Sequence, residues 1–434
     1  MSASSAPRVL LVAHHANPTL TSESLIGWRW AEQLDRRVEL TLVTHVRNRD
    51  AIEAAGTLRG RVRYVDTESL ARRINRLNDL LFACRGSVNR LLLEALGQRA
   101  FDRAAVRFAK ELVAQGEVDV IHRVSPISPR YPSGLGRLGV PFVIGPMNGG
   151  MGAPAGFESV ARKERQRVLA LRPLARLLDP LGRTLAGASS LLVANETTRA
   201  TLPRRDRARA EVLCENAVEI DRYRPHFARR GSGLRLLYLG RLLPYKGVQY
   251  AIEAIQRLPA ELGARLDVVG DGSYRRALEE RVRGRYLRSR VRFLGQVAHE
   301  EVPGRMRACD VFVLPSIRES GGSVVLEAMA AGKPVIVADH GGPSETVPNT
   351  AGIRLPCNGE AALTDNLVRA LAHLATNEER RERMGRAARA HVEQNYTWEA
   401  KADRAIRLYD ELILRSRAKN AAWTMPPFHA LSHG

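Results

Sequence analysis

Two glutamates, Glu319 and Glu327, are separated by seven residues around the expected start of a helix. Gly321 and Gly322 lie between them, and glycine lets a backbone come close to a ligand. The start of a helix directs free N–H groups and the positive end of the helix dipole outward, so an anion is expected there. From Gly322 to Glu327 a helix rises roughly 7 to 8 Å. A diphosphate flanked by two groups of hydroxyls, the layout of a nucleotide sugar, fits this pattern.

Two cations lie upstream in a loop that follows the apolar run 234–239. Arg241 and Lys246 are both expected between a buried strand and a helix. Paired cations in such a loop can hold a diphosphate without a metal and stabilise the charge that develops as it leaves. We therefore predict a phosphate-binding role for both and no required metal, since no His, Cys, Asp and Glu cluster in the sequence has ligand spacing.

The segment 318–343 resembles the E-x7-E signature of the retaining glycosyltransferases of family 4. The segment 240–247 is similar to the family's G-R-x-x-x-x-K-G motif, and the close match covers residues 234 to about 356. The resemblance implies an α/β protein of glycosyltransferase-B (GT-B) architecture, in which two Rossmann-like parallel-sheet domains face each other across a cleft. It also implies that Glu319 contacts the donor sugar and Glu327 the ribose. The remaining donor-side candidates are Ser320, Gly321, Gly322, Ser323, Gly270 and Val297.

The N-terminal half is similar to one branch of the same family through the segments 8–14, 21–23 and 118–150. By this resemblance the loops at Ser22 and at Asn148, Gly149 and Gly150 line the cleft, although turn geometry alone could explain their residue types.

Three positions depart from the family pattern. Thr21 stands where the branch more often has glycine, Gly321 where many members have a larger residue, and Val124 where many carry a histidine near the sugar. His122 is then a candidate substitute catalytic residue, with a structural histidine as the alternative. The adjacent His14 and His15 are expected on opposite sides of a continuing strand, so at most one faces the cleft.

Length and composition indicate a two-domain globular protein. The chain has 434 residues, of which 44% are hydrophobic and 26% charged. Alternating strands and helices favour parallel sheets covered by helices on both faces. We expect a first domain at 1–222 and a donor domain at 234–394. A helix at 397–416 is expected to return to the first domain, followed by a disordered tail at 417–434.

The formal net charge of +21 predicts an acidic partner. The sequence has no nucleic-acid-binding motif, so nucleic acid is not expected. The segment 162–183 has one apolar side and several arginines, which suits either an anionic membrane surface or packing on the first domain. No apolar run approaches the ~18 residues of a membrane span. Four widely spaced cysteines and an N-terminus without a signal-peptide pattern favour the cytoplasm, with peripheral association at the inner face of the membrane.

The sequence as a whole predicts transfer of a hexosyl-type sugar, with retention, from a nucleoside-diphosphate sugar to a glycan, lipid-linked or small-molecule acceptor. No cofactor besides the donor is expected. Two alternatives remain open: a sugar-nucleotide epimerase, which would need acid and base groups beside the sugar, and a non-catalytic nucleotide-sugar-binding membrane adaptor.

Overall fold

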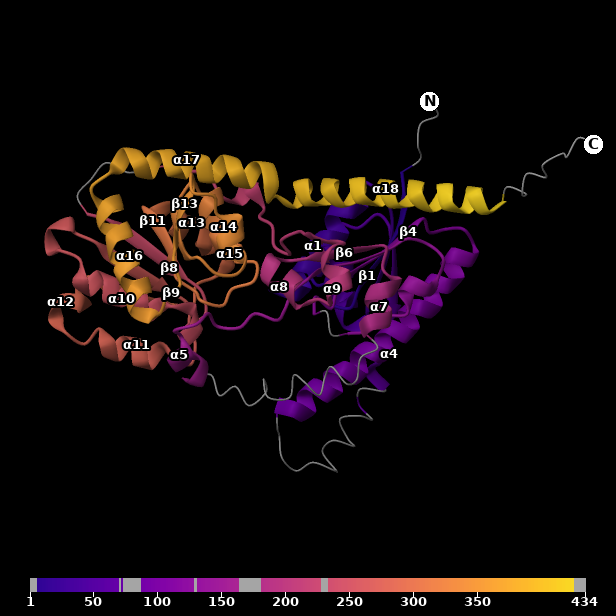
Figure 1. Ribbon diagram of the computed structural model, residues 1–434, viewed down its shortest axis with the longest axis horizontal. Helices are drawn as coiled ribbons and strands as arrows, with labels where there is room; N and C mark the ends of the chain where they lie inside the picture. Colours follow the sequence, from indigo (N-terminus) through magenta and orange to yellow (C-terminus); the bar gives the residue numbers. More distant parts are fainter. Residues whose placement is uncertain are drawn as a thin grey trace, which may run out of the picture.

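Strands alternate with helices along the chain and assemble into two separate parallel sheets, one in each domain (Figure 1). The computed structural model describes residues 6–69, 72, 87–128, 131–163, 181–227 and 233–424. The two-domain α/β prediction is confirmed, and among the described residues the strands of both sheets pair in parallel. Parallel strands share one carboxyl edge, and ligands in such sheets bind beyond it.

The first sheet has seven strands, whose order places the first strand of the chain near the middle. Its apolar runs are buried on both faces, as expected for a sheet covered by helices. In spatial order the strands are β3 (Arg61–Val65), β2 (Glu39–His45), β1 (Arg8–Ala13), β4 (Val120–Ser125), β5 (Phe142–Met147), β6 (Ser190–Val193) and β7 (Ala210–Val212). The helices of this domain are α1 (Glu23–Asp35), α2 (Arg49–Ala55), α4 (Ser87–Ala114), α7 (Leu181–Gly187), α8 (Glu196–Thr201) and α9 (Arg204–Arg207). Helix α5 (Glu158–Lys163) comes from the same part of the chain but packs on the second domain, where Val160 joins the core (Figure 1).

The second sheet has six strands and one large apolar core. In spatial order they are β10 (Val291–Gly295), β9 (Arg265–Val269), β8 (Arg235–Leu239), β11 (Val311–Leu314), β12 (Val335–Ala338) and β13 (Gly352–Leu355). The helices are α10 (Val248–Arg257), α11 (Arg275–Arg281), α12 (Arg285–Arg288), α13 (Val302–Ala308), α14 (Ser323–Ala330), α15 (Gly342–Thr346), α16 (Glu360–Ala375) and α17 (Glu378–Asn395).

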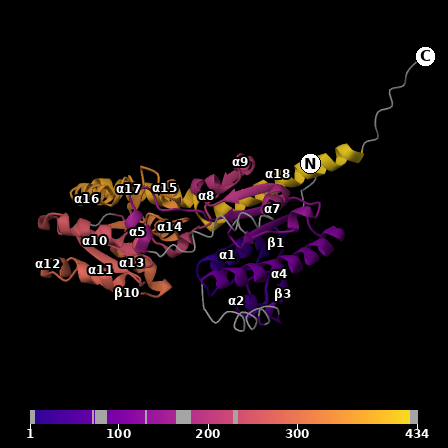
Figure 2. The same cartoon turned by 60° about the horizontal axis from the view of Figure 1, so that its bottom comes forward.

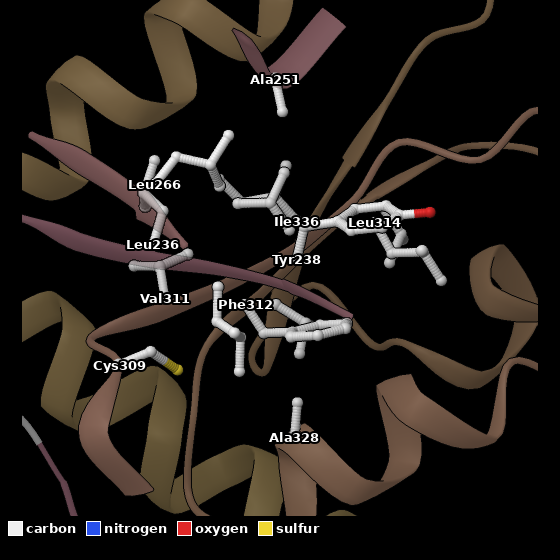
Figure 3. Packing of buried hydrophobic residues seen from close by; sticks show 14 of the residues in the cluster. Leu236, Tyr238, Ala251, Leu266, Cys309, Val311, Phe312, Leu314, Ala328 and Ile336 are labelled. Carbon is white, nitrogen blue, oxygen red and sulfur yellow. The ribbon is translucent and has the colours of Figure 1, made fainter. Parts of the chain in front are cut away.

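The core of the second domain also anchors the loops above it. Figure 3 shows Phe312 and Leu314 of β11 packed beside Tyr238 of β8, with Ala328 of α14 facing them. The Tyr238 hydroxyl, at the edge of this cluster, donates to the Arg241 carbonyl oxygen at 3.0 Å. A core side chain therefore fixes the backbone of the loop that carries Arg241.

The last helix, α18 (Trp398–Thr424), leaves the second domain and packs on the first. In Figure 1 it runs in yellow over the first domain while α17 covers the second. Helix α18 contacts α1 and β4, and Figure 2 shows the same crossover from another side. The predicted return helix is present, but it continues to Thr424 instead of ending at 416. Of the expected disordered tail 417–434, residues 417–424 are therefore helical, and 425–434 lie outside the described residues.

Two further predicted segments fall partly outside the described residues. The amphipathic stretch 162–183 is one, and the interdomain linker, where 228–232 are not described, is the other. Strand β7 ends at Val212 and β8 begins at Arg235, so the two sheets divide where the sequence predicts the linker. Among the described residues, no helix is long and apolar enough to cross a membrane.

Candidate functional site

The candidate donor loop connects β11 to α14 and carries Glu319 through Gly322. Gly322 has φ 56°, a left-handed backbone conformation, and directly precedes the first residue of α14. The loop is supported from behind by the glycine pair that follows β12. A Cβ atom on Gly342 would overlap the Ser320 carbonyl oxygen, and one on Gly341 would overlap that of Glu319. Only glycines allow this close approach, so the backbone before α14 is held in place by the segment that follows β12.

Lys246 and Glu319 form an ion pair across two loops. Lys246 ends a short 3₁₀ helix, Pro244–Lys246, after β8. Both side chains are largely buried, at 12% and 16% exposed. The next residue, Gly247, has φ 78° and packs so tightly on the Pro315 carbonyl that a Cβ atom would overlap it. The structure thus brings together two sequence-predicted residues that lie 73 positions apart.

Arg241 lies in the same loop and is oriented by an aromatic side chain. Its Nη2 donates to the Tyr245 hydroxyl at 3.3 Å, and the Arg318 guanidinium lies 5.2 Å from the centre of the Tyr245 ring. Gly270, with φ 127°, packs against the Gly240 carbonyl with no room for a Cβ atom. Val297 follows β10, is partly buried and packs on the core of the second domain. Gly270 therefore supports the cation loop, while Val297 belongs to the packing beneath it.

Glu327 lies one turn into α14, partly buried and beside the interdomain segment. Burial raises the pKa of its carboxyl, and a hydrogen bond from the Tyr223 hydroxyl opposes that rise. Tyr223 is itself buried, which together with the nearby carboxylate raises its own pKa. The second glutamate of the motif therefore has a protein partner, which the sequence did not indicate.

The first-domain candidates lie in the loop before α1 and in the loop after β5. Ser22 has φ 60°, the one non-glycine residue with positive φ among the described residues, and directly precedes α1. Such strained backbone is concentrated at functional sites. Asn148 donates from Nδ2 to Oε1 of Glu215 at 2.8 Å. Gly149 exchanges hydrogen bonds with Thr198, and Gly150 has φ 78° against Thr201. These last three residues shape the loop after β5.

His122 is a structural residue, which corrects the prediction that it could act at the sugar. It is 0% exposed, and both ring nitrogens are occupied. Nδ1 lies 2.5 Å from the Tyr409 hydroxyl and Nε2 lies 2.8 Å from the Gly145 carbonyl. The ring also meets Trp30 edge to face. Its position on β4 is covered by α18, and the sequence could not show this because Tyr409 is so distant in the chain.

The expectation for His14 and His15 is also wrong. Strand β1 ends at Ala13, so the alternation of a strand no longer separates the two side chains. Their rings lie side by side, with His14 Nδ1 3.0 Å from His15 Nε2. Gln98 approaches His14 at 3.2 Å. Burial lowers the pKa of His14 to about 2, so this ring is neutral.

The first domain also contacts the donor loop directly, through residues that lie outside the sequence motifs. Asn195 accepts from the Thr198 amide to cap α8 and donates from Nδ2 to the Ser320 side chain at 3.2 Å. Glu215 lies against Gly321, where a Cβ atom would overlap Asn216. Gly321 therefore departs from the family pattern because the first domain fills the space of a larger side chain. Only the polar character of 214–216 hinted at this contact in the sequence.

Among the described residues, no group of three or more His, Cys, Asp or Glu side chains could hold a metal ion. Lys246 and Arg241 in the loop after β8 and the backbone N–H groups at the start of α14 suit an anionic ligand.

Residues 219–391 match the model of the family described as glycosyl transferases group 1. Over 172 residues the chain is 34% identical to a GDP-mannose-dependent monoacylated alpha-(1-6)-phosphatidylinositol monomannoside mannosyltransferase of Corynebacterium glutamicum, covering 38% of this chain and 44% of the relative. It is 33% identical over 181 residues to the alpha-D-kanosaminyltransferase of Streptomyces kanamyceticus, covering 41% and 46%. The chain thus matches less than half the length of these curated relatives.

The fold likeness, in contrast, extends over both domains. HepE of Anabaena, solved in complex with UDP, superposes with a TM-score of 0.60 at 17% identity, over 93% of this chain and all of HepE. Sucrose-phosphate synthase of Thermosynechococcus elongatus gives 0.62 at 20% identity, over 94% of this chain and all of the synthase. These likenesses establish the GT-B fold, and the sequence match lies in the second domain. The match to the glycosyl transferases group 1 model is confined to residues 219–391 of this chain.

Proposed function

We propose that the protein is a retaining glycosyltransferase that moves a sugar from a nucleoside-diphosphate sugar to an acceptor hydroxyl. The observation that carries this proposal is the Lys246–Glu319 ion pair in the loops that precede α14. It places a cation, a carboxylate and free backbone N–H groups together, the set that a sugar diphosphate needs.

The residues divide between the two ends of the donor. Lys246, Arg241 and the Gly321–Ser323 backbone would bind the diphosphate and stabilise the charge that grows on it as the bond to the sugar breaks. Glu319 would accept hydrogen bonds from the sugar hydroxyls, and Glu327 from the ribose. The acceptor oxygen then bonds to the anomeric carbon on the face that the phosphate leaves, and the acceptor proton passes to the leaving phosphate oxygen. No protein nucleophile and no metal is required by this route.

The acceptor is proposed to be lipid-linked. The Corynebacterium relative acts, by its name, on a phosphatidylinositol monomannoside, and this chain carries a formal net charge of +21 that suits an anionic membrane surface. Peripheral binding at the inner face of the membrane would bring the cleft to such an acceptor. Flotation with vesicles tests this: we expect recovery with anionic vesicles that is lost in high salt, and equal recovery with neutral vesicles would contradict it.

Thermal stabilisation by a panel of uridine, guanosine and adenosine diphosphate sugars identifies the donor, because a ligand raises the melting temperature according to its concentration relative to Kd. Release of free nucleoside diphosphate in the presence of an acceptor then separates a transferase from an epimerase, which releases none. Stabilisation without turnover would favour the adaptor, and no stabilisation by any donor would overturn the proposal.

A further inference from the structure

Glu215 is a buried carboxyl at the junction of the two domains, two positions after the Leu213 that follows β7. It is 2% exposed. Oε1 accepts from Asn148 at 2.8 Å, and the Ser320 side chain hydrogen-bonds to the same carboxyl. Oε2 is buried and has no hydrogen-bond partner among the described residues. A buried polar atom left in this state is rare and calls for an explanation in terms of function or strain.

The contacts around Glu215 hold one short segment of the second domain. Asn195 Nδ2 lies 3.3 Å from the Ser320 carbonyl oxygen and 3.2 Å from its hydroxyl. The Cys214 thiol lies 3.7 Å from the Gly321 carbonyl oxygen. Glu319 directly precedes Ser320, so the first domain determines the backbone on which Glu319 is placed.

We propose that Glu215 is a positioning residue that fixes the segment 319–321 against the first domain and so couples docking of the two domains to the placement of Glu319. The role at the donor sugar rests on the proposed function. The placement of the segment does not, because it follows from the contacts alone.

The charged groups around Glu215 affect the pKa of its carboxyl. Burial raises the pKa of the Glu215 carboxyl, and the nearby Glu319 carboxylate raises it further, while Lys401 opposes the rise. The Lys401 ammonium is occupied by the carbonyl oxygens of Cys214 and Asn216. An uncharged amide of the same shape avoids repulsion with Glu319 and keeps an acceptor for Asn148, so glutamine should replace the carboxyl.

Two substitutions test the proposal. Glu215→Ala removes the contact to Ser320, and we expect kcat to fall about ten- to a hundred-fold, while the Kd for free nucleoside diphosphate stays within about two-fold. Glu215→Gln keeps the shape of the side chain and carries no charge. Its kcat should therefore lie within about three-fold of the wild-type value. A residue needed only for global stability would not show this split between kcat and Kd.

Asp102 offers a matched control in the first domain. It is a carboxyl whose pKa burial raises, and it accepts from the Ser133 hydroxyl at 2.5 Å and the Gly134 amide at 3.0 Å. Asp102→Ala should lower the melting temperature as Glu215→Ala does but leave kcat unchanged. A similar loss of kcat in both variants would show a general stability effect and overturn the proposal.

A readout independent of turnover separates this inference from the proposed function. Hydrogen exchange of the full chain reports on amides in 317–326, including those of Val325 and Leu326, which donate to the Gly322 carbonyl. Exchange there should accelerate in Glu215→Ala and stay at the wild-type rate in Glu215→Gln. Unchanged exchange in the alanine variant, or equal acceleration in both, would refute the positioning role. If no donor is turned over by the wild type, the proposed function fails, and exchange still decides the role of Glu215.

Discussion

The Lys246 ammonium contacts the Glu319 carboxylate, so an ion pair joins the loop after β8 to the loop after β11. Each side chain limits the conformations of the other. A donor that inserts its diphosphate beside Lys246 and its hydroxyls beside Glu319 exchanges this pairing for interactions of the same kind. The site is therefore preorganised in charge as well as in shape.

This pairing predicts strong non-additivity. Lys246→Ala and Glu319→Ala should each reduce kcat/KM, and the double variant should lose less than the sum, with a coupling energy of about 0.5–3 kcal/mol. Initial rates for the four proteins measure it. The exposed Arg386–Glu382 pair on α17 is the control, where coupling should be near zero. Additive losses for Lys246 and Glu319 would mean that the ion pair has no role in turnover.

The two motif glutamates should separate kinetically. Glu319→Ala removes a contact to the sugar and should lower kcat about ten- to a hundred-fold, with little change in binding of free nucleoside diphosphate. Glu327→Ala should weaken that binding by a similar factor. Isothermal calorimetry with the diphosphate, which lacks the sugar, distinguishes them, and Tyr223→Phe tests whether the partner of Glu327 contributes. An equal loss of affinity in both variants would refute the division.

Transfer should be independent of divalent metal, because Arg241, Lys246 and the start of α14 supply positive charge at the diphosphate. We expect EDTA to leave the initial rate unchanged. Loss of activity in EDTA that magnesium or manganese restores would mean that these groups do not suffice. Lys246→Met, which keeps most of the side-chain length without the charge, should then be assayed with and without added metal.

Acid should destabilise the protein through His122. Burial lowers the pKa of this imidazole from 6.5 to about 4, so the unfolded chain binds its proton first as the pH falls. The stability contributed by neutral His122 is fully present above pH 6.5 and is lost as the pH falls to about 4, a difference of about 3 kcal/mol. Denaturant unfolding at several pH values should show a shallower slope in His122→Gln, although that variant is less stable at pH 7. The exposed His373→Gln is the control, and an identical slope in wild type and His122→Gln would contradict the assignment.

Much of the fold and of the donor-side site could be predicted because the signals are local. The apolar runs around Leu236, Val268 and Val335 define parallel strands, and the spacing of Glu319 and Glu327 follows from one helix start. Trp398 and Tyr409 are both buried on α18, as their helical spacing predicts. What these residues do in catalysis stays a prediction, since it depends on substrates.

Where the sequence did not predict the surroundings of a residue, as for His122 and Gly321, those surroundings come from distant segments of the chain. His122 is adjacent in sequence to candidate cleft loops, but Tyr409 covers it from the far end of the chain. Position 321 requires a glycine because Asn216 and Glu215 of the other domain occupy the space that a larger side chain would need. His14 and His15 were misjudged for a local reason, because the end of β1 could not be placed to the residue.

The closure of α18 on the first sheet also sets an order of assembly. Tyr409 is made 287 residues after the His122 that it covers. At roughly 5–20 residues per second, the ribosome needs on the order of 15 to 60 s to supply it. During that interval the surface of Trp30 and His122 has no cover from α18, while the second domain, contiguous from β8 to α17, can fold as it emerges. The domain that begins the chain is therefore the last to be completed.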